Sequence, residues 1–295
     1  MILVIGATGI LGMQICHILS EKEKAFRVLV RVSSDQWKVD QLRKMGADIF
    51  IGDLKFPLSL AKACEGITQV ISTATTTKLQ QEGDTIQTVD HDGQLYLVKA
   101  AKDAGIKKFV FISYTDNPLI EYPLNRAKKD VEKALKESGM NWTSLWASYF
   151  MESWLSPALG FDYANGHARI YGSGERKISW ISFRDVAKFA VHALYSPVAD
   201  NTIIQIGGPN QLSPKEVVRI FEEVQGRKFN IEYVPVETLQ KNKKTARDPL
   251  EESFAGLMLH YASGDRIDMR NLLSKIHVEM TSVKEYARQV SVAYA

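Results

Sequence analysis

The chain has 295 residues, of which 45% are hydrophobic and 24% are charged, and its formal net charge is +3. This composition is typical of a globular protein that buries one large core, or a core and a smaller lobe. The small net charge argues against nucleic acid or an acidic membrane surface as a partner, because such partners usually require a concentrated basic face.

The opening stretch "MILVIGATGILGMQ" predicts a strand, a tight turn and the start of a helix. A short apolar run spans residues 2–5, three glycines follow at three-residue spacing, and a helical pattern covers residues 10–19. A secretory signal needs a basic leading region, and a membrane span needs about 20 apolar residues without helix breakers. Because neither pattern is present here, we expect this stretch to serve a soluble domain.

Apolar, β-rich runs recur along the first half of the chain, with helical segments between them. The predicted strands after the first are residues 26–30, 48–51, 68–72, 107–112 and 142–145. Strands that alternate with helices indicate a parallel sheet covered on both faces. One intervening helix is predicted over Thr85 to Ala104, where Gly93 would allow a close approach to the sheet. The sequence therefore predicts an α/β fold, a Rossmann-type doubly wound parallel sheet, with a dinucleotide-binding domain over residues 1–150.

A smaller C-terminal α/β lobe is predicted over residues 151–295, and some of its segments are expected to return to the main sheet. Ser182 precedes Asp185 by three residues, and Ser213 precedes Glu216 in the same way. Both pairs are typical of capping boxes at helix starts. We therefore interpret Asp185 as a helix cap and not as a catalytic carboxylate.

The glycine turn is the strongest functional signal in the sequence. Gly6 permits the sharp turn, Gly9 lets backbone N–H groups approach a pyrophosphate, and Gly12 lets helix and strand pack closely. The helix N-terminus adds partial positive charge for an anion. The other predicted cofactor-binding residues of this turn are Thr8, Ile10 and Leu11.

The end of the second strand indicates which dinucleotide binds. An NAD site usually places a carboxylate there for the ribose 2′-hydroxyl, whereas a 2′-phosphate needs a cation. This strand ends in Arg31, and Ser33 follows it. A guanidinium pairs well with phosphate, and a hydroxyl adds a further hydrogen bond. We expect NADP(H) in preference to NAD(H); the alternatives are that Arg31 is a surface residue, or that Asp35 serves an NAD ribose.

Three further loops follow strands and are expected at the same edge of the sheet. Asp53 and Leu54 follow the third strand, where a carboxylate or a neighbouring amide can meet the adenine amino group. The small residues after the fourth strand are expected beside the ribose or pyrophosphate, and one serine follows the fifth: Thr73, Ala74, Thr75 and Ser113. The general polarity of loops is an alternative explanation for these residues.

A lysine on the predicted helix "YPLNRAKKDVEKALKESG" is the main catalytic candidate. Short-chain dehydrogenases carry a tyrosine four residues before a lysine, but here Leu124 precedes Lys128 and Asn125 precedes Lys129 at that spacing. The tyrosine–lysine pair is therefore absent. Helical geometry places Lys128 at the edge of the apolar stripe and Lys129 on the solvated side. Lys128 can reach towards the cofactor, or it can simply cover apolar surface.

The cysteines and histidines do not suggest a metal site. Cys16 and Cys64 lie in apolar helical patterns without metal or redox spacing, which fits a reducing compartment, and we expect the cytoplasm. The six histidines are scattered, and His91 and His192 are interpreted as ordinary helix residues. We therefore expect no metal.

The motifs together resemble the NmrA-like and isoflavone-reductase-like atypical short-chain dehydrogenases. They are GATGxxG, the arginine ending the second strand, "VDHDGQLYLVKAAKDAGIKKFVFIS", "K-x-x-V-E-K-A-L-x-x-S-G" with "W-T-S-L", "S-F-R-D-V-A" and, more patchily, "IGGPNQLSPKEVV". The resemblance implies NADP(H) as cofactor, with Lys128 near the nicotinamide. Where the family normally has an arginine after the sixth strand, this chain has Trp146.

The resemblance also implies hydride transfer from NADPH to a quinone-like or activated carbonyl or enone molecule, held in a cleft between the lobes. Lys128 would orient the nicotinamide ribose and stabilise the developing oxyanion. Tyr149 is the second catalytic candidate. The expected apolar walls are Tyr149, Phe150 and Trp180. The proton donor is left open between Tyr114, Tyr122 and water.

Two alternatives belong to other functional classes. Family members divide between reductases and non-catalytic redox sensors, so the chain could sense NADP(H) and pass the signal to a regulatory protein partner. An assembly factor that retains the fold without the chemistry is the third alternative. A homo-oligomer is also compatible with the sequence.

Overall fold

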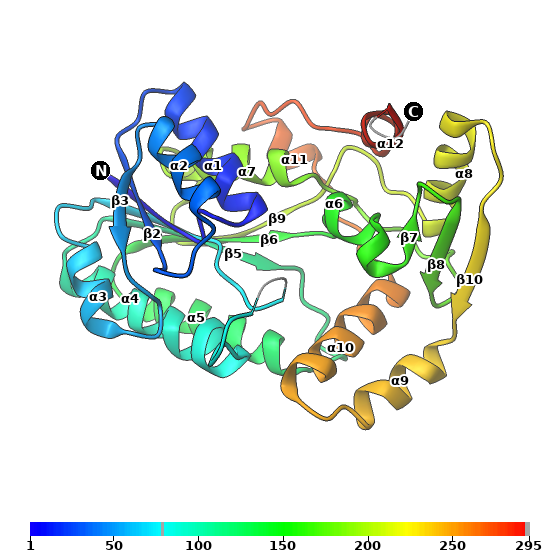
Figure 1. The fold of residues 1–295 in the computed structure, drawn as a ribbon, viewed down its shortest axis with the longest axis horizontal. Coiled ribbons are helices and arrows are strands. Elements are labelled where there is room, and N and C mark those ends of the chain that lie inside the picture. Colours follow the sequence, from blue (N-terminus) through cyan, green and yellow to red (C-terminus); the bar gives the residue numbers. More distant parts are fainter. Residues whose placement is uncertain (78–79, 293–295) are drawn as a thin grey trace. The chain divides into compact units, whose positions relative to one another are not determined.

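The computed structural model describes residues 1–77 and 80–292 of the chain (Figure 1). These residues form two compact units, each built from separate stretches of sequence. The first unit comprises Met1–Ser113, Pro123–Trp146 and Ala187–Ile204. The second comprises Tyr114–Tyr122, Ala147–Val186 and the chain from Gln205 onward. Within the described ranges, no helix combines the length and the apolar character needed to cross a bilayer.

A seven-stranded sheet with the order β3-β2-β1-β4-β5-β6-β9 organises the first unit. Its strands are β1 (Ile2–Ile5), β2 (Phe26–Val30), β3 (Asp48–Ile51), β4 (Gln69–Ser72), β5 (Lys108–Tyr114), β6 (Asn141–Ala147) and β9 (Thr202–Ile206). β1 pairs in parallel with both β2 and β4, with Ile5 opposite Leu29 and Ser72. The strand order thus reverses beside β1, where open α/β sheets bind their ligands. This arrangement confirms the predicted doubly wound fold.

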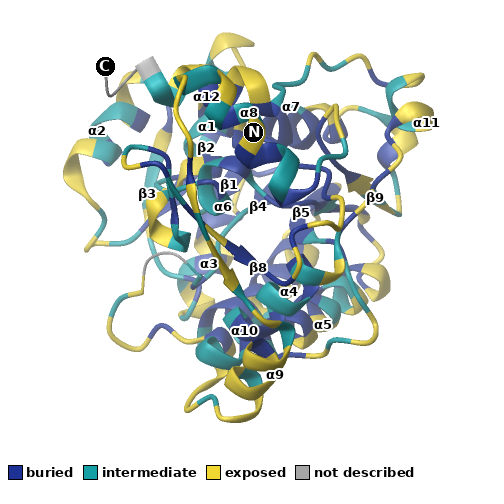
Figure 2. Cartoon of the chain, turned by 90° about the vertical axis from the view of Figure 1, so that its right-hand side faces the viewer, coloured by how far each residue is buried: buried dark blue, intermediate teal, exposed yellow. Residues whose placement is uncertain are grey.

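Helices cover both faces of this sheet (Figure 1). One face carries α1 (Ile10–Glu21), α2 (Gln36–Lys44) and α7 (Phe183–Ala193), and the other carries α3 (Pro57–Ala63), α4 (Gln94–Asp103) and α5 (Pro123–Glu137). A short 3-10 helix, η3 (Pro197–Ala199), precedes β9. The central strands β1, β4 and β5 are almost entirely buried and are dark blue in Figure 2. Near-continuous apolar strands are expected where a parallel sheet is covered twice.

The helix predicted over residues 85–104 is two helices in the structure. A π-helix, η1 (Ile86–Gly93), runs directly into α4. Thr85 caps η1, and its side chain and that of Thr88 form a reciprocal capping box. Gly93 approaches another segment closely, because a Cβ there would lie 3.0 Å from the Cβ of Leu54. The spacing of apolar residues did not distinguish a π-helix from an α-helix in this segment. π-helical turns are frequent at functional sites.

The second unit combines a small mixed sheet with helices. Its strands are β7 (Phe161–Asp162), β8 (His167–Tyr171) and β10 (Asn230–Val234), with β8 parallel to β10 and antiparallel to β7. Its helices are α6 (Met151–Trp154), η2 (Pro157–Leu159), α8 (Pro214–Gln225), α9 (Val236–Lys244), α10 (Pro249–Ser263), α11 (Arg270–Leu273) and α12 (Val283–Val292). Aromatic residues dominate its core, among them Trp180, Phe221 and Tyr261.

Two helix starts were predicted in the second lobe, one at Ser213 and one at Ser182. Ser213 and Glu216 form the complete capping box at the start of α8. The Ser182 hydroxyl accepts a hydrogen bond from the backbone N–H of Asp185 at 3.0 Å, as expected. The Asp185 carboxylate, however, accepts from the backbone N–H of Thr281 at 2.7 Å. Asp185 therefore also ties the segment before α12 to the start of α7.

Gly12 is the tightest packing point between β1 and α1. A Cβ at Gly12 would lie 2.2 Å from the carbonyl oxygen of Gly6 and 2.7 Å from the Cα of Ala7. In an open helix, replacing glycine with alanine is stabilising by about 0.5–1 kcal/mol. Here we expect Gly12→Ala to lower the free energy of unfolding by about 2 kcal/mol or more, because backbone atoms must move.

Chemical denaturation measures this effect, and Gly105→Ala is the matched control. Unlike Gly12, which lies within α1, Gly105 has a positive φ of 71°, and a Cβ there would meet no atom within 4 Å. Only the left-handed backbone is then strained, which costs about 1–2 kcal/mol. If the Gly12→Ala protein is as stable as the wild type, the packing of α1 against β1 tolerates a Cβ at this position.

Candidate dinucleotide-binding site

The turn after β1 presents an uncapped helix N-terminus. Gly6 has φ +81°, and its carbonyl oxygen accepts a hydrogen bond from the Gly9 N–H at 2.9 Å. Gly9 is the N-cap of α1 and has no side chain to cap the helix, and the first turn contains no acidic residue. The first N–H groups of a helix have no partner within the helix. This end of α1 can therefore hold an anion.

The glycine turn packs closely against the end of β4. A Cβ on Gly6 would lie 2.6 Å from the Thr73 hydroxyl oxygen and 2.9 Å from the Ala74 nitrogen. The turn can therefore lie against the end of β4 only because Gly6 lacks a side chain. Gly9 and Ile10 are exposed, whereas Leu11 is buried and Thr8 is half-buried.

The segment after β4 is fixed to β1 and to the helices η1 and α4. The backbone N–H and the hydroxyl of Thr73 both donate to the carbonyl oxygen of Ile5 at 3.0 Å. The Gln94 side chain accepts from Ser72 at 2.8 Å and donates to the carbonyl oxygen of Ala74 at 3.1 Å. Sequence reasoning placed this segment at the sheet edge but missed Gln94, because its partner lies 22 residues away.

Two buried polar atoms in this region have no hydrogen-bond partner within the described residues. They are the hydroxyl oxygen of Thr75 and Oδ1 of Asp90. The other carboxylate oxygen of Asp90 accepts from the N–H of Thr76 at 3.0 Å and from its hydroxyl at 2.6 Å. Buried polar atoms usually have partners, so these two are available to a ligand at this edge. Asp90 was not predicted from the sequence.

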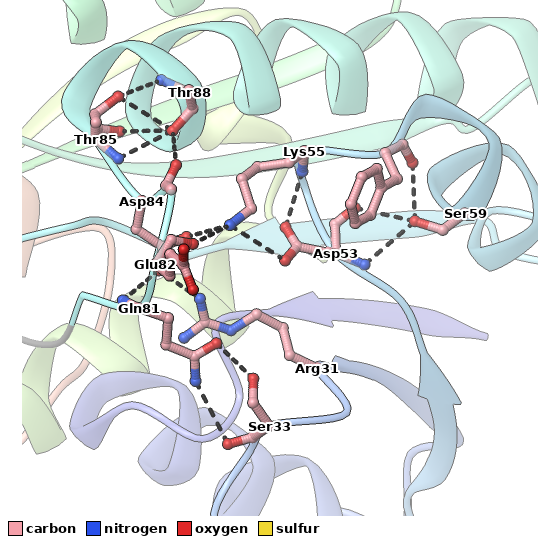
Figure 3. A network of polar contacts seen from close by, with 12 residues as sticks. Arg31, Ser33, Asp53, Lys55, Ser59, Gln81, Glu82, Asp84, Thr85 and Thr88 are labelled. Atoms are coloured by element: carbon pink, nitrogen blue, oxygen red, sulfur yellow. Dashed lines mark hydrogen bonds and ion pairs between the residues drawn. The ribbon is translucent and has the colours of Figure 1, made fainter.

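Arg31 and Ser33, the predicted ligands of a 2′-phosphate, lie together at the end of β2 (Figure 3). Arg31 Nη1 lies 2.5 Å from Oδ2 of Asp84, and the Ser33 hydroxyl donates to Oε1 of Gln81 at 2.5 Å. Asp35, the alternative ribose ligand, caps α2 by accepting from the N–H of Trp37. The sequence did not predict that Arg31 pairs with Asp84.

Asp53 and Lys55 complete this group of charged residues. Asp53 accepts a hydrogen bond from the N–H of Lys55 at 2.9 Å, while Leu54 is buried. Lys55 Nζ lies 2.6 Å from Oδ1 of Asp84 and 3.7 Å from Oδ2 of Asp53. Burial alone would raise the pKa of Asp84, but hydrogen bonds from Lys55, the Gln81 backbone and Arg31 hold that pKa below its usual value. Asp84 is therefore charged at neutral pH.

Lys128 is a buried cation at the carboxyl end of β5. Its Nζ donates to the carbonyl oxygen of Ile112 at 3.0 Å and lies 4.5 Å from the centre of the Phe111 ring. Burial lowers the pKa of Lys128, and the carboxylates of Asp90 and Glu132 oppose that shift. Helical geometry correctly placed Lys128 on the sheet-facing side of α5, while Lys129 is partly exposed. The predicted cofactor residue Ser113 is buried and follows Ile112 on β5.

Trp146 occupies the position of the arginine that the family pattern carries. Its Nε1 donates to Oε1 of Glu132 at 2.7 Å, and the Ser144 hydroxyl donates to the same oxygen at 2.7 Å. The indole nitrogen is thus directed towards α5. An indole N–H donates a hydrogen bond but carries no charge.

The remaining predicted residues lie in the second unit. The Tyr149 hydroxyl donates to the carbonyl oxygen of Leu257 at 3.0 Å, and its ring packs edge-on against Trp154. Phe150 stacks on Phe183, and Trp180 is buried in the aromatic core. The rings of Tyr114 and Tyr122 are stacked 6.2 Å apart. The catalytic role of Tyr149, the wall residues and the choice of proton donor stay predictions.

The described residues contain no group of three or more histidine, cysteine, aspartate or glutamate side chains that could hold a metal ion. Cys16 and Cys64 are both buried with free thiols. Burial raises the pKa of the Cys16 thiol, and it raises the pKa of the Cys64 thiol to about 11. Thiols with raised pKa values are poor nucleophiles, so the site chemistry rests on other groups.

The lowered pKa of Lys128 predicts a specific pH dependence of stability. Between the lowered pKa of the folded state and the ordinary value of 10.5, the unfolded chain binds more protons than the folded chain. Stability from this group therefore rises with pH in that window. We expect the wild type to gain stability relative to Lys128→Met as the pH approaches 10.5, measured by urea unfolding at several pH values. A difference that stays constant with pH would show that burial does not lower the pKa of Lys128.

Comparison with known proteins identifies relatives of this chain. The NAD(P)H azoreductase of Xenophilus azovorans is 31% identical over 262 residues, which cover 88% of this chain and 85% of that protein. The photosystem II assembly factor Ycf39 of Trieres chinensis is 29% identical over 241 residues, covering 80% of this chain and 72% of that protein.

Among solved structures, the NADPH-dependent quinone oxidoreductase QOR2 of Escherichia coli, complexed with NADPH, has the same fold. Its TM-score is 0.79 at 20% identity, and the match covers 99% of this chain and 100% of that chain. The sequence pattern of the NmrA-like family matches residues 1–287, in agreement with the resemblance seen in the motifs. Because this match spans nearly the whole chain, the chain belongs to the NmrA-like family.

Proposed function

We propose that the chain is an NADPH-dependent reductase that transfers a hydride to a small, electron-poor acceptor such as a quinone, an activated carbonyl compound or an enone. The observation that carries this proposal is the uncapped glycine turn after β1, in the same unit as Arg31 and the buried cation Lys128. The similarity to an NAD(P)H azoreductase supports it and adds azo compounds to the acceptors worth testing.

The cofactor would be held by residues at the carboxyl ends of β1, β2, β3 and β4. The backbone N–H groups of Ile10 and Leu11 would bind the pyrophosphate at the start of α1, while the Gly9 N–H holds the turn by donating to the Gly6 carbonyl oxygen. Asp53 and Leu54 would lie beside the adenine, and the segment Thr73 to Thr75 beside the ribose or pyrophosphate. The orphaned hydroxyl of Thr75 supports this placement, because a ligand atom would complete its hydrogen bonding.

The preference for NADP(H) rests on Arg31 and Ser33. A guanidinium binds a phosphate through charge-assisted, often bidentate, hydrogen bonds, and a serine hydroxyl can add another. The Arg31 side chain is 30% exposed, so solvent and ligands can reach it. We therefore assign the 2′-phosphate to the end of β2.

Lys128 would be the residue of the protein that assists hydride transfer. A bound reduced nicotinamide supplies the hydride. A lysine ammonium has three donors, and one of them is used on Ile112, so others can orient the nicotinamide ribose and a substrate oxygen. A fixed buried cation stabilises developing negative charge without reorganisation. A lowered lysine pKa also brings the group closer to neutral pH, where acid catalysis is most effective.

A non-catalytic role is the second candidate. The tyrosine–lysine pair of short-chain dehydrogenases is absent, and one relative is named as a photosystem II assembly factor. A sensor or assembly factor would bind NADP(H) tightly, with a preference for one redox state and without turnover, and would engage a protein partner or a second copy of the chain. The cytoplasmic location expected from the two cysteines also stays a prediction.

Turnover of NADPH separates the two candidates. We expect oxidation of NADPH, followed by absorbance, with at least one member of a panel of quinones, enones and azo compounds. Lys128→Met should lower kcat by about 100-fold while changing the NADPH Kd less than about threefold. Lys129→Met, one position along α5, is the control and should retain wild-type turnover. Unchanged turnover in Lys128→Met would remove this lysine from the mechanism, and tight binding without turnover would favour the sensor.

The cofactor preference is tested by Arg31→Met. Loss of the guanidinium should weaken NADPH binding by about tenfold or more and NADH binding by less than about threefold, because only NADPH carries the 2′-phosphate. Calorimetric titration gives both Kd values. Arg43→Met is the control, because Arg43 is an exposed arginine on α2 that pairs with Asp40. Equal losses for the two nucleotides would place the 2′-phosphate elsewhere.

A further inference from the structure

Residues 81–84, here called the acidic turn, place a buried carboxylate between two cations (Figure 3). The Asp84 side chain is only 2% exposed, and both of its oxygens are engaged. Oδ1 lies 2.6 Å from Lys55 Nζ, whereas Oδ2 lies 2.5 Å from Arg31 Nη1 and accepts from the Gln81 N–H at 2.9 Å. Asp84 is thus a tightly held internal counter-ion.

The acidic turn also binds Ser33. The Ser33 hydroxyl donates to Oε1 of Gln81 at 2.5 Å, and the Gln81 amide donates back to the Ser33 carbonyl oxygen at 3.4 Å. The turn is further held by Lys55, whose Nζ lies 3.4 Å from the carbonyl oxygen of Glu82. Both side chains that the sequence assigns to a 2′-phosphate are therefore engaged by one segment of the protein itself.

The charges of these groups determine whether Asp84 and a phosphate can bind Arg31 and Lys55 at the same time. Arg31 and Lys55 supply two positive charges; Asp84 pairs with both of them, and Lys55 Nζ also lies 3.7 Å from the Asp53 carboxylate. A phosphate monoester carries about −1.5 to −2 charges near pH 7 and needs the same guanidinium donors. Like charges that share one site disfavour each other. The Asp84 carboxylate and a 2′-phosphate therefore compete for Arg31 and Lys55.

We propose that Asp84 sets the cofactor preference of this chain, by competing with the 2′-phosphate of NADP(H) for Arg31 and Lys55. The proposal rests on the proposed function, because it assumes that a dinucleotide binds after β1. Lys55 becomes a second phosphate ligand once Asp84 withdraws. With NAD(H), Asp84 stays in place, because the ribose 2′-hydroxyl carries no negative charge. A carboxylate can also accept a hydrogen bond from that hydroxyl. The wild type would then prefer NADP(H) to NAD(H) less strongly than a site in which Arg31 is not paired with Asp84.

The test compares nucleotide affinities of Asp84 variants by calorimetric titration. Asp84→Asn keeps the shape of the side chain and removes its charge, and Asp84→Ala removes the side chain beyond Cβ. In both, we expect the ratio of NADPH to NADH affinity to rise by about tenfold or more, a change of about 1.4 kcal/mol. The same change is expected for the ratio of 2′,5′-ADP to 5′-AMP affinity, which isolates the adenosine end of the cofactor.

Asp48→Asn is the matched control. Asp48 also pairs with an arginine, Arg27, at 2.7 Å, and its loss changes the net charge equally, but it begins β3 at the opposite end of that strand. The affinity ratio should not change in this variant. An unchanged ratio in both Asp84 variants would overturn the proposal, while a lower ratio would make Asp84 a residue that positions Arg31 for the phosphate. If the wild type and all variants bind neither nucleotide, the proposed function itself fails.

A second measurement needs no variant. Because the Gln81 N–H donates to Asp84, its amide resonance reports whether that carboxylate is in place. In the wild type, 2′,5′-ADP should shift the Gln81 amide signal strongly, whereas 5′-AMP should shift it little. Equal shifts with the two nucleotides, at saturating concentrations of each, would contradict displacement of Asp84 by the 2′-phosphate.

Discussion

The contact between Gly12 and the carbonyl group of Gly6 is the constraint on which the candidate site depends. No Cβ fits at Gly12, so α1 can begin directly behind the end of β1. The start of the helix then lies at the point where the strand order reverses, between β2 and β4. Arg31 at the end of β2 and Thr73 at the end of β4 take their places relative to this turn. A short-range packing requirement thus locates the whole anion site.

Charge is arranged in two different ways around this turn. Lys128 is a buried lysine whose Nζ donates to the neutral carbonyl group of Ile112; burial opposes its charged form, and Asp90 and Glu132 favour it. Arg31 and Lys55 instead both pair with the carboxylate of Asp84, and Lys55 also lies near that of Asp53. We propose that the first arrangement keeps a cation ready for a developing negative charge, and that the second keeps cations paired until a phosphate competes for them.

The sequence predicted the features that depend on local patterns. The first six strands of the main sheet, the glycine turn, the place of Lys128 at the edge of the apolar stripe and the capping box of Ser213 all follow from spacing within a few residues, whereas β9 was not predicted. Contacts between distant residues were missed, because composition does not reveal them. Arg31 and Asp84 are 53 residues apart, and Thr76 and Asp90 are 14 apart. The mixed sheet of the second unit was also missed, because short strands such as β8 carry weak alternation.

The central claim, that the pyrophosphate of the cofactor binds at the start of α1, is tested most directly by backbone amide resonances. NADPH should be titrated into isotopically labelled wild-type protein while the amide signals of Ile10 and Leu11 are followed. The account predicts large, saturating shifts at these amides, because their N–H groups would donate to phosphate oxygens. If NADPH binds and these two signals do not move, or if no signal in the protein moves at millimolar NADPH, the account is contradicted.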